Sequence, residues 1–230
     1  MMKDVRFVLM DIEGTTTSIS FVYEVLFPYF QNNIQRLEKV KNLKQVKQAF
    51  DQVKEIVKKE ENLEINSDQE IIDKLLVWSK EDRKVTPLKT VQGVLWQTGY
   101  KTGEIVGHVY PEVPVKLMEW KNKRLRMGIF SSGSVAAQKL LFGYTATGDL
   151  NRYLEHYFDT KTGPKREVTT YREIANKINF EPKHILFLSD IVEELEAAKE
   201  AGFQTIQLTR PGTVPKWEIT ANDFSEIEFE

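Results

Sequence analysis

The sequence contains no cysteine, and this absence excludes several kinds of chemistry together. Disulfide bonds, thiolate catalysis and zinc sites with thiolate ligands all need the Cys side chain. No apolar stretch approaches the length of about 20 residues that a membrane-spanning helix needs. The N-terminal residues lead directly into a strand pattern, without the apolar segment of a secretory signal peptide. We therefore expect a cytoplasmic protein that does not enter a membrane.

An excess of charge of either sign is also lacking. The 32 basic and 34 acidic residues leave a formal net charge of −2, whereas proteins that bind nucleic acid or anionic membranes tend to carry a basic surface. We expect no nucleic-acid partner. No repeat or low-complexity segment is visible, and 230 residues suit one large domain or a core with a smaller insertion. Because no apolar stripe is left over, we expect a monomer.

The first apolar segment, residues 5–10, has the composition of a strand that is buried on both faces. Two carboxylates, Asp11 and Glu13, follow it, and Gly14 comes next to allow a tight turn. Ligand sites in open α/β sheets lie just outside the carboxyl ends of strands. A carboxylate there can bind Mg²⁺, attack a substrate or move a proton. The alternative is that Asp11 caps the turn and Glu13 is solvated.

Residues 18–104 contain no convincing strand. Apolar side chains recur there at helical spacing, in segments near residues 21–37, 43–57, 67–76 and 86–96. We expect an inserted all-helical cap domain, with residues 1–17 and 105–230 forming the core. A glycine-rich stretch, Gly99 to Gly107, is expected to mark the return to the core. The aromatic side chains of the insertion either pack its helices together or form an apolar surface for a substrate: Tyr23, Phe27, Trp96 and Tyr100.

Strands and helices alternate after the insertion. Buried strands are expected at residues 126–130, 184–188 and 203–208, with a possible short strand at 157–159. Helices are expected at residues 111–123, 135–142, 168–179 and 191–201, and the segment from Arg210 onward has the composition of a loop. This alternation predicts an α/β fold with a parallel sheet and right-handed crossovers.

Polar residues follow the later strands as well as the first. Ser131 and Ser132 come after the second strand, and Asp190 comes after the third. Parallel strands bring these residues to the same edge of the sheet as Asp11. Phosphoryl transfer requires mainly positioning and electrostatic stabilisation. A serine hydroxyl and the amides of Ser132 and Gly133, at the start of a helix, would suit a phosphate.

The remaining parts of a phosphoryl-transfer site are also present. Lys165, directly before an expected helix, is the natural cation for a phosphate. Asp190 and Asp11 would hold Mg²⁺, which prefers few protein carboxylates, and Asp11 would attack phosphorus to give an aspartyl-phosphate. Each residue has a simpler structural explanation. Asp190 could cap the helix that follows, whose N-terminus Glu193 and Glu194 also favour, and Lys165 alone could be a solvated surface charge. The joint pattern favours the functional interpretation.

Four segments together resemble the motifs of the haloacid dehalogenase (HAD) superfamily, and within it the enolase-phosphatase E1 family. They are Asp11 to Thr16, Ser131 to Ser134, Lys165 before a helix, and Ile185 to Asp190. The resemblance implies a HAD-like Rossmannoid core with the helical insertion as its cap. It also implies a methionine salvage enzyme that enolises 2,3-diketo-5-methylthiopentyl-1-phosphate. The enol is then dephosphorylated to the acireductone 1,2-dihydroxy-3-keto-5-methylthiopentene.

The resemblance also assigns roles to residues. It implies that one Mg²⁺ per subunit is bound by Asp11, Glu13 (through its backbone carbonyl) and Asp190. It implies that the small phosphate ester is bound by Ser131, Ser132 and Lys165, to which the helix-start argument adds the amide of Gly133. The neighbouring Lys161 and Arg166 leave open which cation reaches the phosphate, and we choose Lys165.

Three alternatives remain at this point. The first is a HAD phosphatase for another small phosphomonoester, because residues of the insertion would set substrate choice. The second is a dehalogenase, which uses a nucleophilic aspartate without magnesium; Glu13 and Asp190 argue against it. The third is a binding protein without activity, which a missing motif residue would indicate, and none is missing.

Overall fold

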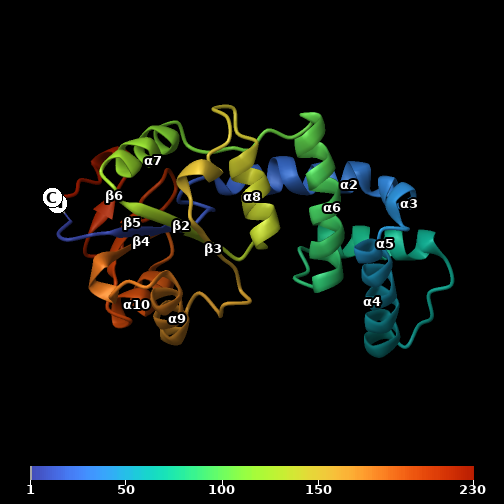
Figure 1. The fold of residues 1–230 in the computed structure, drawn as a ribbon. Helices are drawn as coiled ribbons and strands as arrows, with labels where there is room; N and C mark the ends of the chain where they lie inside the picture. Colours follow the sequence, from blue (N-terminus) through green and yellow to red (C-terminus); the bar gives the residue numbers. More distant parts are fainter. Residues whose placement is uncertain (1) are drawn as a thin grey trace. The chain divides into compact units, whose positions relative to one another are not determined.

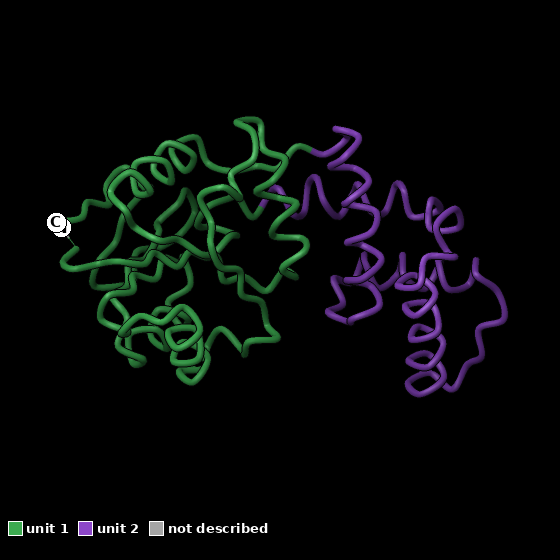
Figure 2. The backbone as a smooth tube through the Cα atoms, viewed as in Figure 1, with its two compact units in different colours: residues 1–19, 106–230 green, residues 20–105 purple. Residues whose placement is uncertain are grey.

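The structure is a computed structural model that describes residues 2–230. The chain divides into two compact units (Figure 2): unit 1 comprises residues 1–19 and 106–230, and unit 2 comprises residues 20–105. The sequence had led us to expect limits at residues 17/18 and 104/105. Among the described residues, no helix is both long and apolar enough to span a bilayer.

Unit 1 is built on a six-stranded sheet in the order β3-β2-β1-β4-β5-β6. Every neighbouring pair is parallel, so the predicted α/β fold class is confirmed. The strands are β1 (Phe7–Met10), β2 (Arg126–Phe130), β3 (His156–Phe158), β4 (Ile185–Ser189), β5 (Gln204–Leu208) and β6 (Thr220–Ala221).

The first strand of the sequence lies inside the sheet, between β2 and β4. All four of its side chains are buried, as its unbroken apolar composition predicts. Its last residue, Met10, is in register with Ile129 on β2 and Leu188 on β4. The residues that follow these strands therefore begin at neighbouring points on one edge of the sheet.

Helices cover both faces of the sheet (Figure 1). α7 lies on one face, and α9 and α10 lie on the other. The second face carries an apolar core in which Phe7 and Leu9 of β1 pack with Tyr171 of α9 and Leu195 of α10. The helices of unit 1 are α7 (Glu112–Asn122), α8 (Val135–Gly143), α9 (Val168–Ile178) and α10 (Val192–Glu200), with short 3₁₀ turns at Asn151–Tyr153, Pro182–His184 and Phe224–Glu226.

Unit 2 contains helices and no strand over residues 20–105, all of which the structure describes. Its core is apolar and includes Phe30, Val53, Leu75 and Trp78. The helices, which follow α1 (Ile19–Phe21) along the chain, are a π-helical turn at Val22–Leu26, α2 (Phe27–Asn33), a 3₁₀ turn at Ile34–Arg36, α3 (Leu37–Val40), α4 (Lys44–Glu61), α5 (Asp68–Lys80) and α6 (Thr86–Thr102).

Two expectations from the sequence were wrong. Gly99 does not begin a new pattern, because α6 continues through it to Thr102. A Cβ at Gly99 would lie 2.6 Å from Cζ of Tyr29, so this glycine allows close packing inside unit 2 rather than breaking a helix. The segment after Arg210 is not only loop, because Thr220 and Ala221 add β6 to the edge of the sheet. Two residues are too few to produce a strand pattern in the sequence.

Candidate active site

Three predicted site residues follow neighbouring strands. Asp11 follows β1, Ser131 follows β2 and Asp190 follows β4. Because β1 lies between β2 and β4, the three residues begin side by side at one edge of the sheet. All are buried, with exposed fractions of 5%, 5% and 9%. Polar groups buried together at the carboxyl ends of parallel strands are typical of a ligand site in this class of fold.

Lys165 joins this cluster from the loop before α9. It is buried, and its Nζ lies 2.6 Å from Oδ1 of Asp11 and 2.6 Å from Oε2 of Glu194. The hydroxyl of Tyr171 donates a hydrogen bond to the Lys165 carbonyl at 2.7 Å and so holds the backbone at this point. Lys161 and Arg166, the two alternative cations, are exposed.

Glu194 is a member of the cluster that the sequence interpretation missed. It is buried in the first turn of α10 and accepts a hydrogen bond from the Ser189 hydroxyl at 2.9 Å in addition to its pair with Lys165. Its position in the sequence fits a carboxylate that favours a helix N-terminus. The signal that could have found it is its spacing of four residues from Asp190, which places it in the first turn after the strand end.

The cluster contains more buried acids than cations. Burial, followed by the negative charge of Asp11, raises the pKa of Asp190 to about 6 and that of Glu194 to about 7. Burial by itself would lower the pKa of Lys165, but the carboxylates of Asp11 and Glu194 raise it above the ordinary value, so this lysine stays charged. One ammonium group thus faces the buried carboxylates of Asp11 and Glu194, with Asp190 beside them, and the site favours an additional cation.

A compact loop carries Asp11 and Glu13 at its start. The N–H groups of residues 15–17 all donate to the carbonyl of Ile12, at 3.2, 2.9 and 2.9 Å. Gly14 has a φ of +73°, and a Cβ there would lie 2.5 Å from Cγ of Asp190. Only glycine allows this loop to lie against the Asp190 side chain. The side chain of Glu13 is exposed.

A second loop follows β2. Ser131 Oγ accepts a hydrogen bond from the N–H of Gly133 at 3.2 Å, so this amide, which the sequence placed in an anion nest, is used within the loop. The side-chain amide of Gln138 donates to the carbonyls of Gly133 and Phe158 at 2.7 and 2.8 Å, which ties the loop to β3. Ser132 is exposed at the turn.

The residues at this edge fit a small divalent cation. Oδ1 of Asp190 is buried without a hydrogen-bond partner, which is unusual for a carboxylate oxygen. Among residues 2–230, no group of three or more His, Asp and Glu side chains forms a metal site by side chains alone. Mg²⁺ needs no such group, because it is commonly bound by one or two carboxylates with water and substrate oxygens. Asp11, Asp190 and the backbone of Glu13 are the groups available.

Comparison with known proteins shows the family to which the chain belongs. The family model for haloacid dehalogenase-like hydrolases matches residues 5–202. The enolase-phosphatase E1 of Picosynechococcus sp. is 51% identical over 209 residues, which cover 91% of each chain. That of Drosophila persimilis is 46% identical over 219 residues, which cover 91% of this chain and 87% of the relative. The chain belongs to the enolase-phosphatase E1 family.

A solved structure has a similar fold over almost the whole chain. The Unknown transcript 4 protein of Saccharomyces cerevisiae is 34% identical and has a TM-score of 0.81, with 97% of this chain and 100% of that chain covered. Family membership confirms the prediction of a phosphatase of the hydrolase class. It also decides against the dehalogenase and the inactive binding protein as alternatives.

Proposed function

We propose that the chain converts 2,3-diketo-5-methylthiopentyl-1-phosphate to 1,2-dihydroxy-3-keto-5-methylthiopentene and phosphate, as a bifunctional enolase-phosphatase. The observation that carries the proposal is the buried pair between Asp11 Oδ1 and Lys165 Nζ, 2.6 Å apart at the strand ends. A carboxylate that is buried beside a fixed cation suits a nucleophile for a phosphate ester better than a structural cap. The names of the relatives supply the reaction type.

The phosphate group is bound by Lys165 and by the loop after β2. Lys165 supplies a positive charge. Because Lys165 is buried, water screens its attraction to the phosphate only weakly. Ser131 supplies its hydroxyl, and Ser132 and the amide of Gly133 lie just before the N-terminus of α8, where anions are favoured. When phosphate binds, the Gly133 N–H exchanges Ser131 Oγ for a phosphate oxygen.

One Mg²⁺ is held by the carboxylates of Asp11 and Asp190 and by the backbone carbonyl of Glu13. The buried, unpartnered oxygen of Asp190 and the surplus of buried acid support this assignment. The bound ion supplies positive charge against the negative charge that develops during phosphoryl transfer.

Enolisation comes first and changes no atom count. A proton leaves the carbon beside a carbonyl group and the carbonyl oxygen gains one, which requires an acid/base group and a polarising charge. Glu13 is our candidate for moving the proton, because its carboxylate is exposed and lies near enough to Asp190 for its charge to help raise the pKa of Asp190. Lys165 is positioned to polarise the oxygen.

Phosphoryl transfer follows at Asp11. A carboxylate oxygen forms a bond to phosphorus, the bond from phosphorus to the ester oxygen breaks, and the product oxygen takes a proton. Water then cleaves the aspartyl-phosphate, which releases phosphate and restores Asp11. Throughout, Lys165 faces the charge on the phosphoryl oxygens.

The test is to incubate the purified protein with the diketone phosphate and Mg²⁺, and to follow the enediol absorbance and free phosphate in the same reaction. Both signals should rise, and excess EDTA should stop them. The proposal would be refuted if the protein released phosphate from other esters but formed no enediol from the diketone phosphate. A panel of small phosphomonoesters, run in parallel, tests the alternative that the same site serves another ester.

Unit 2 is proposed to act as the substrate-selecting cap. Trp96 donates its indole N–H to the Leu26 carbonyl at 2.9 Å and Tyr100 is 3% exposed, so both help to pack unit 2. Tyr23 is 52% exposed and lies edge-on against the Phe27 ring, with centroids 5.5 Å apart. Of the four aromatic side chains, Tyr23 is the exposed one, and Phe27 is half-buried beside it. The cytoplasmic location and the monomeric state stay predictions.

A further inference from the structure

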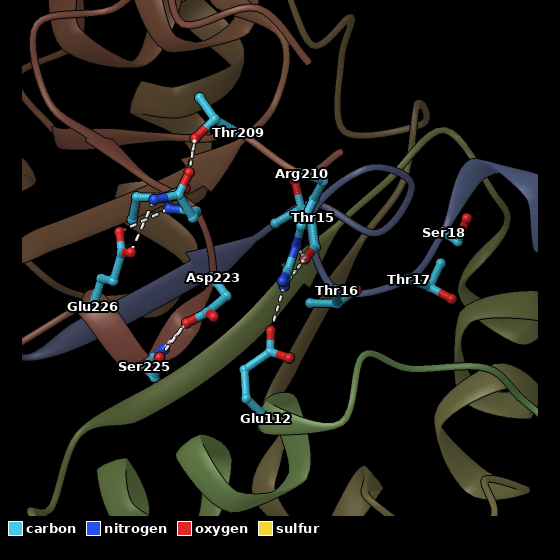
Figure 3. A network of polar contacts seen from close by, with 12 residues as sticks. Thr15, Thr16, Thr17, Ser18, Glu112, Thr209, Arg210, Asp223, Ser225 and Glu226 are labelled. Carbon is cyan, nitrogen blue, oxygen red and sulfur yellow. Dashed lines mark hydrogen bonds and ion pairs between the residues drawn. The ribbon is translucent and has the colours of Figure 1, made fainter. Parts of the chain in front are cut away.

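A buried arginine outside the catalytic cluster contacts the loop that carries Asp11 and Glu13. Arg210 follows β5 and is 5% exposed. Its Nε and Nη2 both donate to the carbonyl of Thr15, at 3.2 and 2.8 Å. Nη2 also pairs with Oε1 of Glu112, in the first turn of α7, at 2.6 Å (Figure 3). The segment that follows β5 thereby holds a loop that lies almost two hundred residues earlier in the sequence.

The same arginine acts on the loop through a second residue. Its guanidinium carbon lies 3.8 Å from the centroid of the Tyr110 ring, a distance at which a cation is attracted to the ring face. The backbone N–H of Tyr110 donates to the carbonyl of Thr16 at 3.0 Å. Two consecutive carbonyls of the loop, those of Thr15 and Thr16, are therefore held by Arg210 and by the residue on which it stacks.

These contacts do something that the loop cannot do for itself. The bonds from residues 15–17 to Ile12 fix the shape of the loop, but they leave its position against α7 and β5 undetermined. The end of the loop is anchored by the contacts of Thr17 and Ser18 with His108. Arg210 anchors its middle, at Thr15, with a planar donor group that a lysine cannot reproduce. A buried ion pair is costly to desolvate and stabilises a fold poorly compared with apolar packing. Its presence here is better explained by the geometry it imposes.

We propose that Arg210 is a positioning residue, which sets the place of the Asp11 loop and thereby the affinity of the site for Mg²⁺. The inference rests on the proposed function, because it takes the Glu13 carbonyl and the Asp11 carboxylate as metal ligands. Groups that orient metal ligands typically change metal affinity or activity by about 10–100-fold when they are removed.

The first measurement uses Mg²⁺ alone, without substrate. The rise in melting temperature with Mg²⁺ concentration is fitted to the linkage relation between ligand concentration and stability. The fit gives the Mg²⁺ concentration of half-saturation, here called the midpoint, for the wild type, for Arg210→Met and for Arg210→Lys. We expect the midpoint to rise by about tenfold or more in Arg210→Met and by less in Arg210→Lys. The matched control is Arg126→Met. Arg126 also pairs with a glutamate, Glu155, but it begins β2 and so lies at the opposite end of the strands from the proposed metal site. Its midpoint should stay within about twofold of wild type.

The second measurement is hydrolysis of p-nitrophenyl phosphate at saturating Mg²⁺. Arg210 holds the loop that carries the nucleophile Asp11 but touches none of the proposed phosphate-binding groups. Arg210→Met should therefore lower kcat even at saturating Mg²⁺, while KM changes by less than about threefold. A folded Arg210→Met protein with the wild-type Mg²⁺ midpoint would overturn the inference. So would an equal shift in Arg126→Met, which would make the effect one of general stability.

A milder variant keeps the inference testable if Arg210→Met does not fold. Tyr110→Leu removes the ring under the guanidinium and leaves the Arg210 contacts to Thr15 and Glu112 in place, and it should raise the midpoint by about threefold. An unchanged midpoint in folded Tyr110→Leu would contradict the inference. If wild-type protein itself shows no response to Mg²⁺, the proposed metal site fails, and the positioning role fails with it.

Discussion

The two units of the molecule bury different kinds of side chain. Over residues 20–105, the buried polar residues of unit 2 are Ser79 and Gln92, and neither is charged. Unit 1 buries carboxylates, an ammonium and a guanidinium near one edge of its sheet. Those residues are Asp11, Asp159, Lys165, Asp190, Glu194 and Arg210.

This difference indicates where the chemistry lies. A buried charge costs free energy unless it is paired and hydrogen-bonded, so a unit built only for stability would resemble unit 2. Unit 1 carries this cost in free energy at the place where the side chains of Asp11, Lys165 and Glu194 pair. We therefore expect substitutions in the two units to have different consequences: function should change first in unit 1, and stability should change first in unit 2.

Among the substitutions that compare the two units, the largest effect is expected from Lys165→Ala. Loss of the buried cation should reduce kcat/KM for the phosphate ester by about 10²–10³-fold, because Lys165 faces charge in both the ground and the transition state. KM should rise and kcat should fall. The control is Lys161→Ala, in the same loop but exposed, which should change kcat/KM by less than about twofold. If Lys161→Ala reduced kcat/KM and Lys165→Ala did not, our choice of cation would be wrong.

In unit 2, Leu75→Ala should destabilise the protein without changing the site. Leu75 is fully buried in α5, and removal of such a side chain typically costs about 3 kcal/mol. Denaturant unfolding measures this loss. The Mg²⁺ midpoint of the folded variant should match that of wild type. A changed midpoint would break the proposed division between the units.

A pair of glycines compares the units directly. Gly14 and Gly103 have φ angles of +73° and +76°, but a Cβ at Gly14 would meet Asp190, whereas nothing lies within 4 Å of one at Gly103. Each Ala substitution should cost about 1–2 kcal/mol for its backbone conformation. Only Gly14→Ala should also weaken the melting-temperature response to Mg²⁺. Equal responses in the two variants would show that the contact with Asp190 is unimportant.

The smallest effect concerns pH. Burial raises the pKa of Glu194 to about 7, so the folded protein holds the proton of Glu194 more tightly than the unfolded chain does. This proton stabilises the fold fully at pH values below the ordinary pKa of a glutamate. The stabilisation is lost as the pH rises through about 7. In EDTA, the melting temperature of Glu194→Gln relative to wild type should therefore increase between about pH 5 and about pH 8. A constant difference across this range would contradict the raised pKa.

The sequence predicted the placement of those candidate residues that strand patterns locate. Asp11, Ser131 and Asp190 each follow an apolar strand, and the parallel sheet brings them together as expected. Lys165 was chosen through the resemblance to a family, since a lysine in a loop has no local pattern of its own. The structure buries it against Asp11.

Other parts of the site were beyond local patterns. Glu194 satisfies a helix N-terminus as well as a buried cluster, so its spacing alone does not distinguish the two roles. The partners of Arg210, Thr15 and Glu112, lie 195 and 98 residues away in the sequence. Gly99 was misinterpreted because the sequence alone does not distinguish a glycine that permits close packing from a glycine that ends a helix.

The central claim is that one site performs two reactions and that only the second needs Asp11 as a nucleophile. The most direct measurement uses Asp11→Asn with the diketone phosphate at saturating Mg²⁺, with the enol phosphate followed by ultraviolet absorbance and free phosphate assayed in the same tube. We expect phosphate release to fall by about 10³-fold or more, while some enol phosphate still forms. Equal loss of both signals would contradict the division of labour, and retained phosphate release would remove Asp11 as the nucleophile.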